Sequence, residues 1–161
     1  MRSRRCGTGS APSAARGICS SPGSGSPNHT KDFEIDVVAV LEGADDAVED
    51  LLADGWRAED VALLSTGSRH PEQVERQALS PKAYWDTFWD AEQVFYGHVL
   101  GFKGLERRAV VLAVNSLPDE VRLRERIYVG LSRARDQLVV CGDPAVVREV
   151  GGSELARRLG V

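Results

Sequence analysis

Three arginines near the end of the chain are spaced so that they could meet a phosphate group. Arg122, Arg126 and Arg133 lie in segment 119–135, whose apolar residues recur with a helical period. The apolar stripe of this expected helix consists of Leu123, Ile127, Leu131 and Ala134. A guanidinium fixed beside such a stripe can be aimed at a phosphate that arrives from outside the domain. The alternative for Arg122 and Arg126 is an ordinary solvated helix face.

A second polar segment, Gly101–Arg108 (GFKGLERR), stands next to the apolar run 109–114. Gly104 permits a tight turn or the close approach of another backbone. Glu106 could accept hydrogen bonds from a ribose hydroxyl. The alternative for this short sequence is a plain surface turn. The segment indicates a binding site only when it is considered together with the arginines.

The chain lacks the sequence elements of a complete nucleotide hydrolase. It contains no G-x-x-x-x-G-K-[ST] loop that would cradle phosphates and place a hydroxyl on Mg²⁺, and Lys103-Gly104 has the reverse order. No Asp-Glu pair directly follows an apolar strand, as the second magnesium motif would require. The three histidines form no H-E-x-x-H or Ser/His/Asp pattern. We therefore expect no ATPase activity from this chain alone.

Together, the two polar segments resemble a known pair of motifs. F-K-G-L-E, an apolar strand, about 20 residues and then R-x-R-I-Y-V-G-L-S-R-A-R-D-x-L-V-V resemble the C-terminal motor half of UvrD/Rep-type superfamily 1 helicases. The first segment is similar to their motif V and the second to motif VI, in the same order and spacing. D-V-A-L-L-S-T at residues 60–66 resembles the weaker motif IV, and the resemblance covers roughly residues 35–150.

The resemblance implies a role for each matching residue. Arg133 matches the motif VI arginine, which in the family reaches the γ-phosphate of ATP bound by the other motor half. Glu106 matches the motif V glutamate near the ribose. Lys103 and Gly104 match the turn that couples nucleotide state to the DNA path. Supporting positions of motif VI are matched by Tyr128 and Ser132.

The chain departs from the family pattern in three respects. His98 takes the place of the usual motif V threonine and Leu100 that of its histidine, which affects the DNA-facing half of the motif. Thr66 stands where motif IV often has an arginine, with Arg69 three residues further on. The first motor half, which would hold the phosphates and Mg²⁺, has no counterpart in the sequence.

The elements expected to position these residues alternate between strand and helix. Strands are predicted at 33–41, 60–65, 93–99, 109–114 and 137–141. Helices are predicted at 45–54, 72–79, 119–135 and 144–150. Strands that are apolar throughout indicate an α/β fold with a parallel sheet flanked by helices. The resemblance makes it a RecA-like (P-loop NTPase-type) half domain without the P-loop. Ligands in such folds bind at the carboxyl ends of strands, where we expect both polar segments.

Composition limits the remaining possibilities. With 161 residues, 42% hydrophobic and 27% charged, the chain suits one globular domain. It has no run of 18 apolar residues, so no membrane span is expected. The net charge of −4 is uneven, because acidic residues crowd 32–60 and arginines gather in 101–161. An anion site is therefore expected in the last 60 residues.

The first 31 residues contrast with the rest. They carry five Lys/Arg and no Asp/Glu, and 15 of them are Gly, Pro or Ser. Such a segment buries too little apolar surface to offset its ordering entropy, so residues 1–32 are predicted to be a disordered tail before the domain at 33–161. No apolar core follows the opening arginines, which excludes a secretory signal and favours the cytoplasm.

The function expected from this resemblance is that of one part of a larger enzyme. The chain would be the C-terminal portion of an ATP-dependent DNA helicase and would supply an arginine finger to a cleft completed by an N-terminal half, in cis or in trans. ATP and Mg²⁺ would bind only in the complete two-half motor, whose other partner is single-stranded or duplex DNA. The alternatives are a freestanding module that binds nucleic acid or a protein partner without catalysis, and a truncated gene remnant.

Overall fold

The computed structural model describes residues 16–19, 35–89, 92–118 and 122–160. The strands are β1 (Arg16–Cys19), β2 (Val61–Ser65), β3 (Phe95–His98), β4 (Arg107–Val114) and β5 (Ala134–Gly142). The helices are α1 (Val37–Ala53), α2 (Pro71–Leu79), α3 (Pro81–Trp89), α4 (Leu123–Leu131) and α5 (Pro144–Leu159), with a 3-10 helix at Ala58–Asp60.

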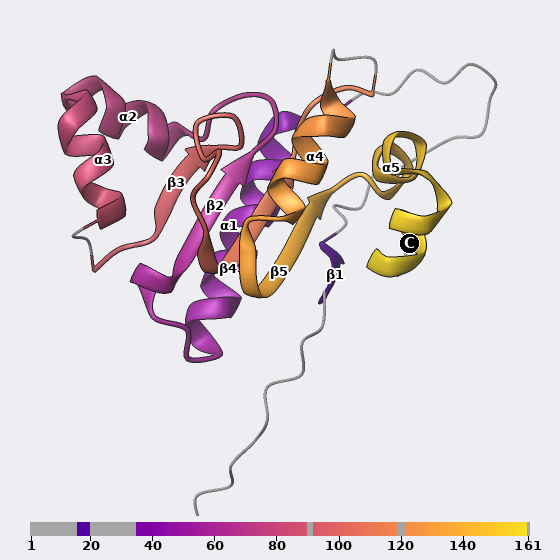
Figure 1. Ribbon diagram of the computed structural model, residues 1–161, viewed down its shortest axis with the longest axis horizontal. Coiled ribbons are helices and arrows are strands. Elements are labelled where there is room, and N and C mark those ends of the chain that lie inside the picture. The colour runs from indigo at the N-terminus through magenta and orange to yellow at the C-terminus, as the bar shows by residue number, and fades with distance from the viewer. Residues whose placement is uncertain (1–15, 20–34, 90–91, 119–121, 161) are drawn as a thin grey trace, which may run out of the picture.

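The centre of the molecule is a parallel sheet (Figure 1). Its four strands β5-β4-β2-β3 are all parallel, and β1 adds a short parallel strand to the outer edge of β5. The central register places Val111 of β4 between Leu63 of β2 and Val139 of β5. The predicted α/β fold with a parallel sheet flanked by helices is confirmed for the described residues.

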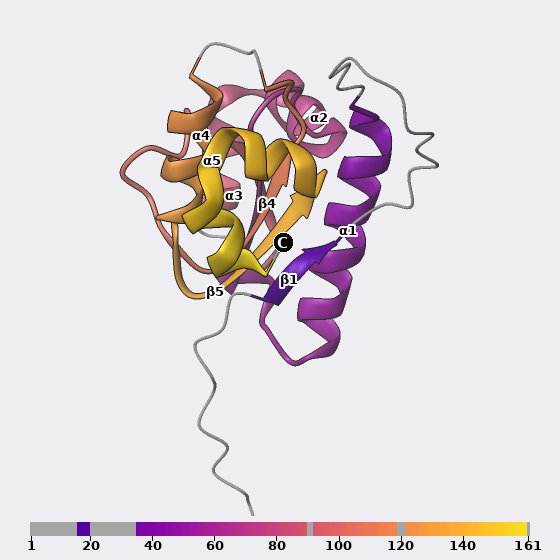
Figure 2. The same ribbon diagram turned by 90° about the vertical axis from the view of Figure 1, so that its right-hand side faces the viewer.

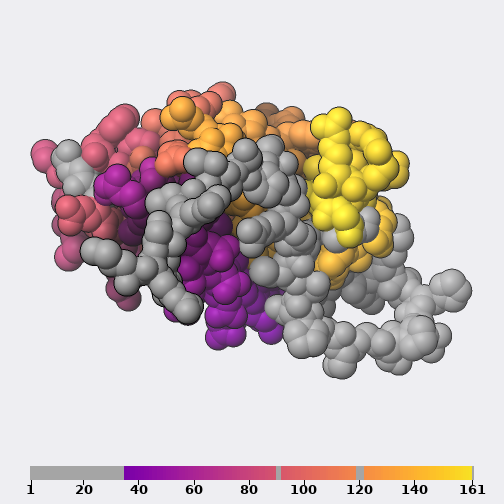
Figure 3. All heavy atoms as spheres, turned by 90° about the horizontal axis from the view of Figure 1, so that it is seen from below, coloured from indigo at the N-terminus to yellow at the C-terminus, as the bar shows by residue number. Residues whose placement is uncertain are grey.

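Helices cover the sheet on both faces (Figure 2). One face packs on α1 through a buried cluster that includes Ala44, Val48, Leu63 and Val111. The other face packs on α3, α4 and α5 through a cluster of larger side chains: Tyr84, Phe88, Phe95, Phe102, Leu112, Leu123, Ile127 and Val146. In the space-filling view from below, α5 in yellow lies at one end of the molecule and the rose-coloured α2–α3 region at the other (Figure 3).

The strand predicted at 33–41 is wrong, because helix α1 already begins at Val37. Asp36 caps the helix, and its Oδ1 accepts a hydrogen bond from the Ala39 amide at 3.1 Å. The residues of the helix that face the sheet are Val40, Leu41, Ala44, Ala47, Val48 and Leu51. The helical spacing of these residues continues into the segment expected to be a strand. Burial of this helix face outweighs the preference of the adjacent valines Val37 and Val38 for β structure.

The helix predicted at 119–135 is shorter in the structure. Residues 119–121 lie outside the described part of the chain, and α4 spans Leu123–Leu131. Ser132 ends the helix as its C-cap, and the amide of Arg133 donates to the Gly130 carbonyl at 3.1 Å. Ala134, expected on the helical stripe, instead starts β5 opposite Arg107 of β4. Pairing with β4 therefore ends the helix before its apolar pattern is exhausted.

The other predicted elements are confirmed with small shifts at their ends. Strands appear close to 60–65, 93–99, 109–114 and 137–141, and helix α2 begins at Pro71, one residue before the predicted start. Helix α5 continues beyond the predicted 144–150 to Leu159 through a kink at Gly152. Apart from β1, the predicted tail lies outside the described residues. In the part of the chain that the structure describes, no helix has the length and apolar character needed to cross a bilayer.

Candidate functional site

The two polar segments singled out in the sequence meet at one edge of the sheet. The Arg107 amide donates to the Arg133 carbonyl at 3.0 Å, and Nη1 of Arg133 donates to the Leu105 carbonyl at 3.3 Å. Arg107 begins β4 and Ala134 begins β5, so the end of the first segment and Arg133 lie at the amino ends of these strands. The expected placement at carboxyl ends is wrong for these residues, because residues that directly precede strands of a parallel sheet gather at its amino edge. Gly101, which follows β3, does lie at the carboxyl edge.

Arg133 is anchored by several contacts at this amino edge. Its Nε donates to the Val129 carbonyl at 3.1 Å and to Ser132 Oγ at 3.2 Å. Its Nη2 donates to the same Ser132 Oγ at 2.8 Å. The side chain is half-buried, so the guanidinium lies at the surface in one defined orientation.

The Lys103–Glu106 turn lies beside Arg133. Gly104 has a φ of +84°, in the left-handed region that favours glycine, and a Cβ built there would meet open space. Lys103 and Glu106 are exposed, whereas Phe102 is only 1% exposed and anchors the turn in the core. The turn therefore presents a cation and a carboxylate to solvent from a fixed base, as a partial nucleotide contact would require.

Arg107 and Arg108, which follow Glu106, are committed to structural contacts. The Arg107 guanidinium lies 3.9 Å from the centre of the Phe88 ring and donates through Nη2 to the Phe88 carbonyl. Burial lowers the pKa of Arg107 from its usual value. Arg108 pairs with Asp136 at 2.7 Å and with Asp60 at 3.6 Å. These two arginines hold α3 and β5 against β4.

A hollow of about 590 Å³ lies at the opposite edge of the sheet, where β2 and β3 end. We call it the carboxyl-edge pocket, and it is lined by Gly67, Ser68, Arg69, Gln73, Gln77, Tyr84, Trp85, His98, Leu100, Gly101 and Arg126. Among these described residues there are two arginines and a histidine but no Asp or Glu. The pocket therefore favours an anion.

His98 and Arg126 are candidates from the sequence that line the carboxyl-edge pocket. His98 Nδ1 accepts a hydrogen bond from the Leu100 amide at 3.2 Å, which leaves the ring proton on Nε2 in the neutral form. Burial lowers the pKa of His98, and the nearby positive charges of Arg126 and Arg69 lower it further. Hydrogen bonds with the backbone of Thr66 and Gly67 oppose this shift and hold the ring beside the two arginines.

Arg126 is not the solvated helix residue considered as an alternative. Its Nη1 reaches from α4 to the Thr66 carbonyl at 3.0 Å, at the carboxyl end of β2. On the other side of the pocket, Arg69 Nη1 donates to Gln77 Oε1 at 3.2 Å. Gln73 is 3% exposed, and its Oε1 has no hydrogen-bond partner among the described residues. Nothing in the sequence marks Gln73 as a pocket residue, because its burial depends on the packing of α2.

The two tryptophans of helix α3, Trp85 and Trp89, have different environments. Trp85 is half-buried, stacks on Phe95 with ring centres 5.8 Å apart, and lines the carboxyl-edge pocket. Its neighbour Tyr84 is buried, and burial raises the pKa of Tyr84 to about 12. Trp89 is 68% exposed and contacts Phe88 edge-on. Trp85 therefore packs on the core and also lines the pocket.

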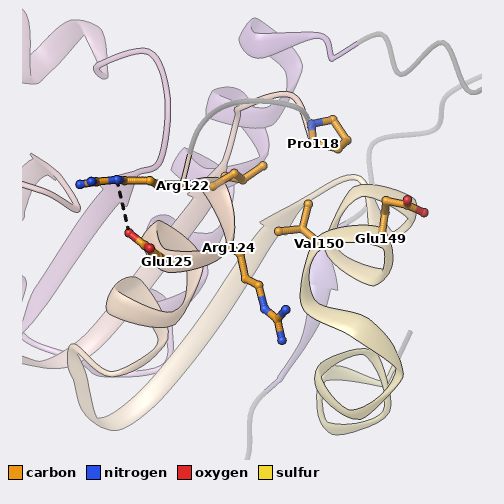
Figure 4. Close-up of a pocket in the computed structure, with 7 residues that line it drawn as sticks. Pro118, Arg122, Arg124, Glu125, Glu149 and Val150 are labelled. Carbon is orange, nitrogen blue, oxygen red and sulfur yellow. Dashed lines mark ion pairs between the residues drawn. The ribbon is translucent and has the colours of Figure 1, made fainter.

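Arg122 lies at the other end of α4 from Arg133. It lines a separate hollow of about 580 Å³ between the start of α4 and α5 (Figure 4). There its Nε lies 3.8 Å from Glu125, while Arg124 points away from this pair. The hollow also contains Glu149, so its charges are balanced and it has no preference for an anion. Arg122 and Arg133, both expected to face a phosphate, therefore lie at opposite ends of α4.

Tyr128 lies on the exposed side of α4. It is 47% exposed, and the Arg124 guanidinium lies 5.8 Å from the centre of its ring. It contacts neither the Lys103–Glu106 turn nor the carboxyl-edge pocket by any hydrogen bond that the described residues show. The structure therefore gives it no direct place in either region.

The comparisons with known proteins leave the family open. No protein-family model and no curated protein matches the chain. Within the described ranges, no group of three His, Cys, Asp or Glu side chains could hold a metal ion. The functional interpretation therefore depends on the geometry of the two sheet edges.

Proposed function

We propose that the chain is the C-terminal, RecA-like motor half of a superfamily 1 type DNA helicase, which acts in the cytoplasm. The observation that carries the proposal is the contact between the two motif-like segments at the amino edge. A guanidinium and a glycine turn with an exposed carboxylate come from segments about 30 residues apart and lie in hydrogen-bond contact. This is the set of groups that a half-site for a nucleotide needs.

Arg133 would act on the phosphates of ATP bound by the other motor half. A guanidinium that is already oriented stabilises charge on a transferring phosphoryl group without reorganisation. Glu106 would contact the ribose hydroxyls, and Lys103 and Gly104 would sense closure of the cleft. As the resemblance implies, Mg²⁺ would be held by the other motor half.

The carboxyl-edge pocket would bind the backbone of single-stranded DNA. Arg69 and Arg126 approach it from different elements, and two arginines can each meet a phosphate. His98 lies in the same pocket, and Trp85 lines it with an aromatic ring that a base could contact. DNA and nucleotide would then occupy opposite edges of one sheet.

The test is reconstitution with an N-terminal superfamily 1 motor half that carries a phosphate-binding loop. We expect ATP turnover that requires both chains and rises with single-stranded DNA, measured as phosphate release. No turnover in the mixture would contradict the proposal, as would turnover by the present chain alone.

The second candidate function is a freestanding nucleic-acid-binding module. The carboxyl-edge pocket favours it, because Arg69 and Arg126 could bind phosphates there without a second motor half. Binding of single-stranded DNA by the isolated chain, without turnover in any reconstituted pair, would select this alternative.

A further inference from the structure

The hydroxyl of Ser132 makes an unusual number of contacts with its neighbours. Ser132 Oγ donates to the Val129 carbonyl at 2.8 Å, which fixes the direction of its own hydrogen. The oxygen then accepts from two nitrogens of Arg133, Nε at 3.2 Å and Nη2 at 2.8 Å. Ser132 Oγ thus holds the edge of the Arg133 guanidinium that carries Nε and Nη2.

The backbone of Ser132 and of Arg133 is held by hydrogen bonds to α4 and β4. The Ser132 amide donates to the Tyr128 and Val129 carbonyls at 3.2 Å each, as the C-cap of α4. The Arg133 carbonyl accepts from the Arg107 amide of β4 at 3.0 Å. Because the backbone cannot shift, the side-chain contacts decide where the guanidinium points.

The contacts leave part of the guanidinium available. Arginine has five N–H donors, and the described residues engage one on each of the three nitrogens of Arg133. One N–H remains on Nη1 and one on Nη2. A phosphate binds such a pair of terminal N–H groups in a bidentate manner.

We infer that Ser132 is a positioning residue that holds Arg133 ready for a phosphate on the facing motor half. This inference rests on the proposed function for its catalytic consequence, but the restraint itself is a property of this chain. A hydroxyl at this position is needed because it donates to the helix and accepts from the arginine at once. Threonine can do both, and alanine can do neither.

The restraint can be measured on the isolated chain by exchange of the two Arg133 Nη groups through rotation about the Nε–Cζ bond, followed by ¹⁵N NMR. In Ser132→Ala the Nε–H keeps its bond to the Val129 carbonyl, whereas Nη2 loses its bond to Ser132 Oγ. Ser132→Ala should therefore speed this exchange about tenfold, which corresponds to the loss of a hydrogen bond to a charged group. Ser132→Thr should keep the wild-type rate. The exposed guanidinium of Arg122 provides an internal reference whose rate stays constant. Unchanged exchange in Ser132→Ala, or no rescue by Ser132→Thr, would overturn the inference.

Turnover by the reconstituted pair tests the catalytic consequence. Ser132→Ala should lower kcat about tenfold with little change in KM, because only the orientation of Arg133 in the transition state is affected. Ser153→Ala, which changes an exposed serine of α5, should leave kcat unaltered. Equal kcat for wild type and Ser132→Ala would overturn the catalytic role. A wild-type pair without turnover would overturn the proposed function, and the exchange rates would still decide whether Ser132 restrains Arg133.

Discussion

The amino edge and the carboxyl edge of the sheet are built in different ways. At the amino edge, the Lys103–Glu106 turn and Arg133 belong to two short segments, and their side chains or turns project from the surface. At the carboxyl edge, the pocket takes residues from five stretches between Gly67 and Arg126. The first arrangement can be recognised as a motif, whereas the second exists only after folding.

Helix α4 is the element that belongs to both edges. Arg126 leaves it toward the carboxyl-edge pocket, and Arg133 follows its last turn at the amino edge. Seven residues separate the two, about 10 Å at the rise of an α-helix. A ligand that moved Arg126 would therefore act on the same rigid element that carries Arg133.

The largest expected effect is at the amino edge. In the reconstituted pair, Arg133→Ala should reduce ATP turnover at least about a hundredfold, because an arginine finger contributes about 10³–10⁵ in rate. Phosphate release at saturating ATP measures it. The free energy of unfolding should fall by no more than about 1 kcal/mol, since the lost hydrogen bonds lie near the surface.

Arg122→Ala is the matched control, because Arg122 is exposed at the opposite end of α4 beside Glu125. It should leave turnover almost unaltered. Similar losses for the two variants would mean that general positive charge, and not the position of Arg133, matters.

The next effect concerns the helix that joins the two edges. A Cβ at Gly130 would lie 2.5 Å from Leu112 Cδ1 and 3.2 Å from Val99 Cγ1, so α4 packs on the sheet at a distance that only glycine allows. Overpacking costs about 1–3 kcal/mol, more than the roughly 1 kcal/mol that alanine adds to a helix. Gly130→Ala should lower the free energy of unfolding by about 1–2 kcal/mol in urea titrations.

Gly43→Ala is the control for this substitution. Gly43 lies in α1, and a Cβ there would have no atom within 4 Å. It should stabilise the chain by up to about 1 kcal/mol. A loss of stability in both variants would show that helix glycines, and not the closeness of α4 to β4, determine the result.

A smaller effect is expected at the carboxyl edge. Arg126→Gln should weaken binding of labelled oligo-dT about tenfold at low salt and reduce the salt dependence of binding by about 0.7 in the log–log slope, as loss of one phosphate contact does for a single strand. Fluorescence anisotropy across a salt series measures both. Arg124→Gln removes a charge from the same helix outside the pocket and should change affinity less than twofold. Equal losses would place the DNA elsewhere.

The sequence predicts the parallel sheet because strands such as 109–114 are apolar throughout, and only burial on both faces suits them. It fails at 33–41, where valines that favour strands lie in α1 because the buried positions repeat every three or four residues. The sequence predicts that Arg133 and the Lys103–Glu106 turn act together only through their resemblance to a pair of motifs, and it does not predict the hydrogen bond between them. Gln73 and Arg126 could not be assigned to a pocket, because their neighbours come from parts of the chain up to 60 residues away.

The smallest expected effect tests the electrostatics of the carboxyl edge through His98. Burial and the charges of Arg126 and Arg69 place its pKa below that of the unfolded chain, so the unfolded state binds the proton more readily. Stability linked to His98 is therefore fully present above pH 6.5 and decreases as the pH falls below it. Urea unfolding at pH 8 and pH 5 should show a larger loss of unfolding free energy for wild type than for His98→Gln.

Bound DNA should raise the pKa of His98, because a phosphate beside the ring favours its protonated form. Affinity of the wild type for oligo-dT should therefore rise between pH 8 and pH 5.5, and that of His98→Gln should rise less. Equal pH dependence in the two proteins would place the phosphate away from His98 and leave the carboxyl-edge pocket without its proposed ligand.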